Sequence, residues 1–321
     1  LKILRKGFLF LGPFRKTSES LRWYRYMAEC GRLVVVTGAA RGIGVGICQQ
    51  ALEQDPGCEV VVLARSLDQA QRTAQDLGPR AHSGCCDVRS TESCLAAASL
   101  VAGLRRGRPV SLVNNAGVGL DLPWMPGPWP ASVARETLEV NLLGAQRMTE
   151  ALLPLLLDER SPGRVVFVSS GAGPVNMKRM SEARRASLEA SSLSCGTLIS
   201  LTEDFVAEYE AAASAAEANP DGERQLPLLS SSGFWLQSYG FSKACLNVYC
   251  RVLARDYPAL VCTTCSPGFV DTDMVKTYEG DSKLRSVKEG GDVPAWLACA
   301  EEARTGCIYN SDRSIGHWVA Q

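Results

Sequence analysis

The chain has 321 residues, a formal net charge of zero from 34 basic and 34 acidic side chains, and a hydrophobic fraction of 46%. This composition supplies a sizeable core and excludes a disordered chain. Balanced charge gives no basic patch for nucleic acid. The longest apolar run, residues 151–157, is too short for a membrane span. We therefore expect a soluble globular protein with no nucleic-acid partner and no membrane partner.

The first 30 residues form a basic N-terminal extension before the domain that we expect at residues 31–321. They hold two acidic residues, Glu19 and Glu29, against the basic residues Lys2, Arg5, Lys6, Arg15, Lys16, Arg22 and Arg25. Met27 lies directly before the first predicted strand, so we expect the natural start there and regard residues 1–26 as extraneous. An organelle transit segment, which is also basic and poor in acidic residues, is the alternative.

Predicted strands and helices alternate from Gly31 onward. The β-branched run at 33–36 predicts a strand buried on both faces. Further strands are expected at 60–63, 81–85, 110–113, 165–168 and 260–265. Helices are expected at 43–54, 67–77, 91–104, 131–157 and 236–257. This order predicts an α/β fold of the Rossmann type, with a doubly wound parallel sheet in a single domain.

Thirteen cysteines, an odd number spread through predicted core segments, favour reduced thiols in a reducing compartment, and we expect the cytoplasm. Cys262 and Cys265 have metal-ligand spacing, but positions i and i+3 of a strand face opposite ways. Only two histidines are present. We therefore expect no metal site, since structural zinc needs four converging ligands.

The loop after the first strand, residues 37–44, carries glycines at positions 38, 42 and 44. Gly38, Gly42 and Gly44 permit a tight turn and a close approach of the backbone to a pyrophosphate. The helix that starts at Ile43 directs its free N–H groups and its positive dipole end at the phosphates. A strand, glycine loop and helix in this order predict a dinucleotide site.

The end of the second strand indicates which dinucleotide binds. A protein that binds NAD usually has an acidic residue there for the ribose hydroxyls, whereas this chain has Arg65, with Arg41 in the glycine loop. Two guanidinium groups attract a 2′-phosphate. NADPH is therefore the expected cofactor, and a solvated surface role is the alternative for Arg65.

These motifs resemble those of the short-chain dehydrogenase/reductase family, over nearly the whole chain from Gly31. The matching positions are the loop 37–44, Asp87 and Val88, the run 114–117, Asn141, Ser170, the pair Tyr239 and Lys243, and the loop 267–272. With the residues above, the expected cofactor-binding set is Gly38, Arg41, Gly42, Ile43, Gly44, Arg65, Asp87, Val88, Asn114, Tyr239, Lys243, Pro267, Gly268, Val270 and Thr272. The resemblance implies a catalytic set of Asn141, Ser170, Tyr239 and Lys243.

Ser170 and Tyr239 are much farther apart in this sequence than in most of the family. The extra segment, about residues 176–234, carries helical patterns at 177–189 and 201–216. Such an insert resembles that of the carbonyl reductase subgroup, including its plant menthone and salutaridine reductase relatives. There the insert covers the face through which other members dimerise, which implies a monomer. The insert leaves Ser169 open as the alternative to Ser170.

Tyr239 and Lys243 lie one turn apart on one predicted helix face. An ammonium beside the phenol is expected to lower its pKa toward neutrality. By resemblance, Tyr239 protonates the carbonyl oxygen as hydride leaves the nicotinamide, and Lys243 also holds the nicotinamide ribose. Ser170 binds the substrate oxygen, and Asn141 holds a water that relays protons to Lys243.

Aromatic residues near these positions suggest a lipophilic substrate. Trp124 and Trp129 lie in a proline-rich loop, and Trp235 precedes Tyr239. We expect Ser170, Trp235 and Tyr239 to contact a lipophilic or aromatic ketone, aldehyde or quinone. NADPH-dependent carbonyl reduction is the favoured activity; NAD(P)-dependent alcohol oxidation and a non-catalytic NADP-binding module for a protein partner are the alternatives.

Overall fold

A seven-stranded parallel sheet forms the centre of the computed structural model, which describes residues 31–122, 124, 130–158, 162–218 and 237–319. The strands are β1 (Leu33–Thr37), β2 (Glu59–Ala64), β3 (Ala81–Cys85), β4 (Val110–Asn114), β5 (Arg164–Val168), β6 (Val261–Cys265) and β7 (Cys307–Tyr309). Their order in the sheet is β3-β2-β1-β4-β5-β6-β7. The order reverses between β1 and β4, so the chain connections part there and leave a crevice at the carboxyl ends of these strands.

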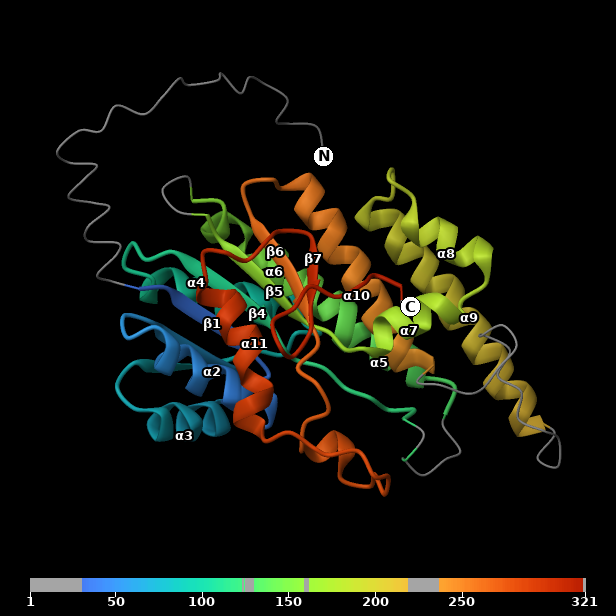
Figure 1. Ribbon diagram of the computed structural model, residues 1–321, viewed down its shortest axis with the longest axis horizontal. Coiled ribbons are helices and arrows are strands. Elements are labelled where there is room, and N and C mark those ends of the chain that lie inside the picture. Colours follow the sequence, from blue (N-terminus) through green and yellow to red (C-terminus); the bar gives the residue numbers. More distant parts are fainter. Residues whose placement is uncertain (1–30, 123, 125–129, 159–161, 219–236, 320–321) are drawn as a thin grey trace, which may run out of the picture.

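Helices cover both faces of the sheet (Figure 1). They are α2 (Ile43–Gln54), α3 (Leu67–Leu77), α4 (Thr91–Leu104), α5 (Val133–Leu138), α6 (Gly144–Leu156), α7 (Ala172–Arg179), α8 (Glu182–Glu189), α9 (Cys195–Ala218), α10 (Gln237–Asp256) and α11 (Val287–Cys299). One buried apolar cluster joins the sheet to α4, α6, α9 and α10, and a second joins its other face to α2, α3 and α11. The doubly wound fold predicted from the sequence is confirmed.

Strand β6 contributes to both clusters. Cys262 belongs to the first and Cys265 to the second, as expected for residues i and i+3 of one strand. The two thiols therefore lie on opposite faces of the sheet and cannot share a metal ion.

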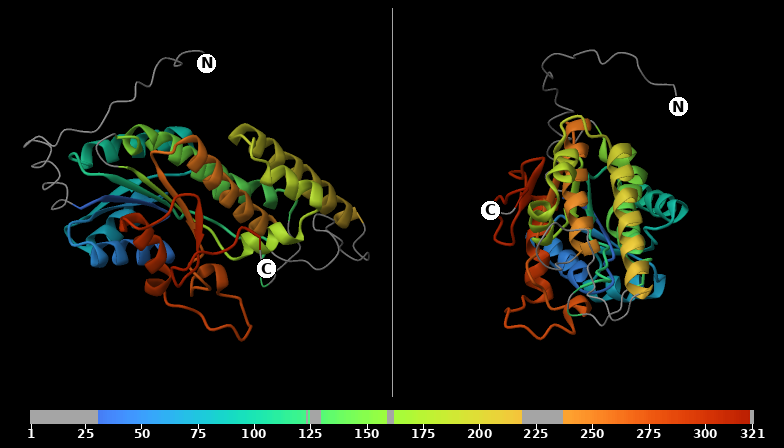
Figure 2. Two further views of the ribbon diagram at one scale, coloured as in Figure 1. Left: turned by 45° about the horizontal axis from the view of Figure 1, so that its top comes forward. Right: turned by 90° about the vertical axis from the view of Figure 1, so that its right-hand side faces the viewer.

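The insert before Tyr239 packs as helices against α10. In Figure 2 the yellow α8 and α9 run beside the orange α10, and the rings of Phe205 on α9 and Phe241 on α10 are stacked with centroids 3.8 Å apart. The guanidinium of Arg184 on α8 lies 5.9 Å from the Phe205 centroid. The described part of the insert, residues 176–218, is helical as expected, but the pattern at 177–189 is split into α7 and α8 at Met180 and Ser181.

Three elements differ from the sequence expectation, and the first is strand β7 (Cys307–Tyr309), which adds a seventh strand to the six expected. The helix expected at 131–157 contains a π-helical segment, Glu139–Leu143, between α5 and α6. Helix α11 was not predicted, because its glycines and Pro294 resemble a loop. Its first turn is stabilised by a capping box between Ser286 and Glu289.

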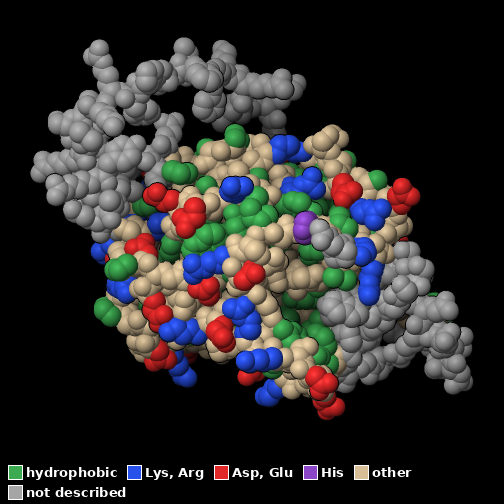
Figure 3. All heavy atoms as spheres, in the orientation of Figure 1, with side chains coloured by type: hydrophobic (Ala, Val, Ile, Leu, Met, Phe, Trp, Pro, Cys, Tyr) green, Lys and Arg blue, Asp and Glu red, His purple; other side chains and the backbone are tan. Residues whose placement is uncertain are grey.

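Basic and acidic side chains are interspersed on the face seen in Figure 3. This distribution matches the zero net charge of the chain. Among the described helices, none is both long enough and apolar enough to span a bilayer. The basic extension expected at residues 1–30 lies outside the described residues.

Candidate active site

The glycine loop after β1 has the backbone shape that a phosphate site requires. Gly38 and Gly42 have φ angles of 62° and 53°, which favour glycine. A Cβ on Gly44 would lie 2.5 Å from the carbonyl oxygen of Gly38. Gly42 precedes α2 without a side-chain cap, whereas Ser66 and Ser90 cap α3 and α4. The first N–H groups of α2 are therefore available to an anion such as a pyrophosphate.

Thr37 and Asn115 hold this loop to the end of β4. The Thr37 Oγ1 accepts hydrogen bonds from the N–H groups of Asn115 at 3.0 Å and Ala116 at 3.1 Å. The Asn115 amide donates to the carbonyl oxygens of Thr37 at 2.9 Å and Gly38 at 3.2 Å. The sequence analysis expects Asn114 to be the functional residue at the end of β4. The structure shows that Asn115 is the residue that fixes the glycine loop.

The Asn114 side chain points into the core. Its amide donates to Thr149 Oγ1 at 3.0 Å, and its Oδ1 is buried without a partner among the described residues. The Asn114 side chain thus ties the end of β4 to α6 through Thr149. The cofactor contact expected of Asn114 stays a prediction.

Arg65, Asp87 and Val88 follow the neighbouring strands β2 and β3. Arg65 is exposed directly after β2, and no acidic side chain stands at that position. Asp87 forms an ion pair with Arg89 at 2.7 Å; the hydrogen bonds from Arg89, and more weakly the charge of Arg65, lower the pKa of the Asp87 carboxyl. Val88 is 7% exposed and its side chain belongs to the core, so the cofactor contact expected of Val88 stays a prediction.

The loop after β6 lies next to the glycine loop. Gly268 has a φ of 86°, which allows the turn after the buried Pro267. Val270 is buried, and the Thr272 methyl lies 3.4 Å from the position that a Cβ on Gly42 would take. The two loops expected to bind the cofactor are therefore adjacent.

Arg41 bridges the same two loops. Its guanidinium forms an ion pair with Asp273 at 2.7 Å, with the two side chains 74% and 67% exposed. Ion pairs this exposed contribute little free energy. Arg41 is therefore able to exchange Asp273 for a phosphate, and the cofactor contact expected of Arg41 stays a prediction.

Ser170, at the end of β5, faces Tyr239 on α10. The Ser170 hydroxyl lies close enough to that of Tyr239 to act on its pKa, and the Ser170 Oγ accepts the N–H of Ala172 at 3.1 Å. Ser169 is buried and donates instead to the carbonyl of Lys243 at 3.4 Å. Of the two serines left open by the sequence, Ser170 is the one that reaches Tyr239.

Lys243 lies one turn after Tyr239 and is buried. Its Nζ donates to the carbonyl of Val168 at 2.9 Å and lies 5.5 Å from the Tyr239 ring centroid. A Cβ on Gly117 would lie 3.5 Å from this Nζ and 3.3 Å from Asn141 Oδ1. Lys243 and Asn141 therefore converge on the same strand end as Tyr239.

Asn141 occupies the centre of the π-helical segment, a distortion frequent at functional sites. Its Oδ1 accepts the N–H of Val118 at 2.8 Å, and its amide donates to the Val118 carbonyl and the Ser242 Oγ, both at 2.9 Å. Both amide protons are thus used to hold the loop after β4 against α10. The water-holding role expected of Asn141 stays a prediction.

Burial governs the protonation of Tyr239 and Lys243. It raises the pKa of Tyr239, and the neighbouring Ser170 hydroxyl opposes this shift. Burial lowers the pKa of Lys243 to about 8. The expectation that Lys243 lowers the pKa of Tyr239 is therefore wrong for this structure, because loss of hydration outweighs the ammonium, which is directed at Val168.

Comparisons with known proteins agree with this geometry. Residues 32–182 match the family model described as short chain dehydrogenase. Carbonyl reductase (NADPH) 3 from Rattus norvegicus is 31% identical over 286 residues, which are 85% of this chain and 92% of the relative. The chain is a member of the short-chain dehydrogenase/reductase family. Membership in this family indicates an oxidoreductase that uses a nicotinamide cofactor.

Other relatives of this short-chain dehydrogenase/reductase belong to the carbonyl reductase-like group. (+)-Neomenthol dehydrogenase from Arabidopsis thaliana is 28% identical over 307 residues, covering 88% of this chain and 97% of the relative. The structure of salutaridine reductase from Papaver somniferum superposes with a TM-score of 0.71 at 25% identity, covering 87% of this chain and 99% of that one. The expected resemblance to the carbonyl reductase subgroup is confirmed.

Asp121 is a residue of the candidate site that the sequence motifs did not reveal. It is 1% exposed, and its carboxylate accepts the N–H of Ser238 at 2.8 Å and of Tyr239 at 3.4 Å. Burial and the nearby Asp121 carboxylate raise the pKa of Tyr209, a residue of the insert. Asp121 therefore lies between the insert helix α9 and the first turn of α10. In the sequence, the position of Asp121 four residues after the run 114–117 was the one feature that could have indicated its role.

Apolar side chains lie against Tyr239 in this oxidoreductase. Tyr239 packs in a small cluster with the buried Leu122 and Ala172 and the partly buried Trp124 and Met274. The Trp124 indole donates to the Met274 carbonyl at 2.9 Å, which fixes the orientation of its ring. Trp124 thus borders the site as expected, whereas Trp129 and Trp235 lie outside the described residues.

Proposed function

We propose that the protein reduces a lipophilic ketone, aldehyde or quinone to the alcohol with NADPH. The observation that carries this proposal is the convergence of Ser170, Tyr239 and Lys243 at the strand ends beside a glycine loop fit for a dinucleotide. The relatives named as NADPH-dependent carbonyl reductases support the same activity.

The cofactor would be held by groups on three loops. The free N–H groups of α2 would bind the pyrophosphate, Arg41 and Arg65 the 2′-phosphate, and Lys243 the nicotinamide ribose. Bound NADPH would supply the hydride. No acidic side chain stands at the position of Arg65, which favours NADPH over NADH.

The chain's own residues would bind and protonate the substrate oxygen. Ser170 and Tyr239 would both hydrogen bond to it, and Tyr239 would donate its proton as the alkoxide charge develops. The raised pKa of Tyr239 keeps the hydroxyl protonated at neutral pH, as a general acid requires. Lys243 and Asn141 would carry the replacement proton from solvent.

Trp124 and Met274 would contact the apolar part of the substrate. Their packing beside Tyr239 supports a lipophilic carbonyl compound over a charged sugar. The insert supports a monomer, because α9 covers α10 through the stacked Phe205 and Phe241. Every cysteine in the described part of the chain is free, which supports the cytoplasm or another reducing compartment.

Initial rates with a panel of quinones, aromatic aldehydes, aliphatic ketones and sugars test this proposal, with NADPH and NADH compared for each. We expect turnover of aromatic and quinone substrates, faster with NADPH. Turnover restricted to sugars, or a preference for NADH, would contradict it. Light scattering on the same sample tests the monomer.

A further inference from the structure

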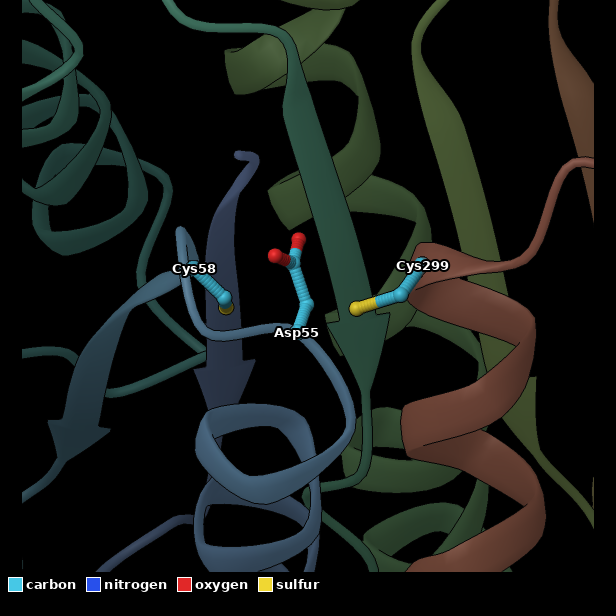
Figure 4. A group of neighbouring side chains, drawn as sticks. All are labelled: Asp55, Cys58 and Cys299. Atoms are coloured by element: carbon cyan, nitrogen blue, oxygen red, sulfur yellow. The ribbon is translucent and has the colours of Figure 1, made fainter. Parts of the chain in front are cut away.

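Two cysteines and a carboxylate meet at the end of the sheet opposite the candidate active site. Asp55 follows α2, Cys58 precedes β2, and Cys299 is the last residue of α11. The sulfur atoms and a carboxylate oxygen all lie within 4.8 Å of one another. Figure 4 shows the three side chains gathered between the turn after α2 and the end of α11. The reaction proposed above uses none of them.

The turn that carries Cys58 is rigid. The Asp55 carboxylate accepts the N–H of Gly57 at 2.9 Å, and the Cys58 N–H donates to the Asp55 carbonyl at 3.0 Å. The Arg80 guanidinium donates to the carbonyls of Asp55, Pro56 and Cys58 at 3.0–3.3 Å. Cys58 is fully buried, while Cys299 is partly exposed. Cys299 is thus the residue of the pair that lies nearer to solvent.

Two guanidinium groups adjoin this pair of thiols. Arg164 is 4% exposed, and its Nε and Nη1 atoms have no partner among the described residues. Arg32 is fixed by hydrogen bonds to Ser111 Oγ at 2.7 Å and the Pro162 carbonyl at 2.7 Å. Both cations lie close enough to Cys299 for its charge to act on theirs. Buried N–H groups without an acceptor are costly, so an anion is expected beside Arg164.

A thiolate at Cys299 is an anion that this setting favours. The neighbouring Cys58 thiol and the cations Arg32 and Arg164 lower the pKa of the Cys299 thiol, against its burial and the Asp55 carboxylate. The Cys58 thiol is held in place, since its Sγ donates to the carbonyl of Glu59 at 3.4 Å. A divalent cation would add to the positive charge of Arg32 and Arg164, and it would compete with the N–H of Gly57 for Asp55.

We propose that Cys299 and Cys58 form a peroxide-sensitive dithiol. The Cys299 thiolate attacks hydrogen peroxide; an S–O bond forms, the O–O bond breaks, and hydroxide leaves as water after taking up a proton. The sulfur of Cys58 then attacks that of Cys299; an S–S bond forms, the S–O bond breaks, and the hydroxyl leaves with the Cys58 proton as water. Two thiols are oxidised to a disulfide and one peroxide is reduced to two waters.

The disulfide would connect the end of α11 to the turn between α2 and β2. Those two helices pack closely, since a Cβ on Gly291 would lie 2.1 Å from the backbone of Gly46. The cross-link closes a long loop of the chain, so it is expected to raise the midpoint of thermal unfolding by about 5 °C or more. It lies at the amino ends of the strands, so carbonyl reduction is expected to continue in the oxidised protein.

The test uses the full chain in a Cys30→Ser/Cys85→Ser background, which removes the exposed Cys85 and a cysteine outside the described residues. After brief exposure to hydrogen peroxide, the protein is alkylated, digested without reductant and analysed by mass spectrometry. We expect a Cys58–Cys299 cross-linked peptide. In Cys58→Ser, dimedone should label Cys299 as the sulfenic acid, and in Cys299→Ser both products should be lost.

Cys86→Ser is the matched control, because Cys86 and Cys94 are a second pair of neighbouring cysteines, in which both residues are buried. This variant should keep the Cys58–Cys299 cross-link. Absence of the cross-link in the folded parent protein, or unchanged peroxide consumption by Cys299→Ser, would overturn the proposal. Stoichiometric zinc bound through Cys58 and Cys299, seen by native mass spectrometry, would overturn it in favour of a metal site.

Discussion

Asp121 accepts the backbone N–H of Tyr239 at 3.4 Å and thereby holds the residue that faces Ser170. The stronger bond of the same carboxylate, 2.8 Å to the N–H of Ser238, satisfies another donor in the first turn of α10. Neither bond reaches a reacting atom. Asp121 is therefore a positioning residue, and it acts through the backbone of the helix.

Asp121→Ala should reduce kcat about tenfold and destabilise the fold by about 1–2 kcal/mol, since α10 loses its cap. Asp121→Asn keeps an oxygen acceptor and should restore most of kcat, with KM for NADPH unchanged. Ser181→Ala, which removes the cap of α8, is the control and should affect stability alone. Equal kcat in Asp121→Ala and the parent enzyme would show that the cap is merely structural.

Arg65→Ala should raise KM for NADPH roughly tenfold or more, because a charge-assisted hydrogen bond to the 2′-phosphate is lost. KM for NADH should not change, since NADH lacks that phosphate. Arg72→Ala removes another exposed arginine from α3 and serves as the control. Steady-state kinetics with both cofactors measure the effect; an equal rise for NADH would refute the assignment.

Trp124→Ala should raise KM for bulky aromatic ketones several-fold and leave KM for small aldehydes nearly unchanged. The Trp124 indole packs in the cluster that contains Tyr239. A large substrate is expected to contact this indole over more of its apolar surface than a small one does. Trp296→Ala on α11, which packs on Tyr309, is the control. If all substrates responded alike, Trp124 would not line the pocket.

The buried Lys243 predicts a pH-dependent stability. Its folded-state pKa of about 8 lies below the ordinary value of 10.5, so the unfolded chain binds more protons between these pH values. The free energy of unfolding of the parent protein relative to Lys243→Met should therefore rise with pH across this window, by at most about 3 kcal/mol. The comparison cancels the titration of Tyr239 and of the buried thiols, which both proteins share. Urea unfolding at several pH values measures it, and a constant difference would contradict the lowered pKa.

The sequence predicted those elements whose ends carry local signals. Helices α3 and α4 have the expected bounds, since Ser66 and Ser90 cap their first turns. Helix α11 was missed because Gly290 and Gly291 disfavour a helix in isolation. The structure shows why a glycine is needed at position 291, since Gly291 lies against the backbone of α2, where no Cβ fits.

The candidate site was predictable to the extent that its residues lie in short motifs. The glycine loop, Ser170, Tyr239 and Lys243 are such residues. Asp121 was not predictable, because its partner Ser238 lies 117 residues away along the chain. The pKa of Tyr239 was also missed, since it depends on burial more than on the spacing to Lys243.

Tyr239→Phe tests the central claim most directly, because it keeps the ring and removes only the hydroxyl that would protonate the substrate. NADPH-dependent reduction of a quinone or aromatic aldehyde is measured for the parent, for Tyr239→Phe and for Tyr257→Phe, a tyrosine just beyond the end of α10. We predict that kcat falls by about 10²–10⁴ in Tyr239→Phe alone, while the Kd for NADPH changes less than about threefold. Full turnover by Tyr239→Phe would contradict the account.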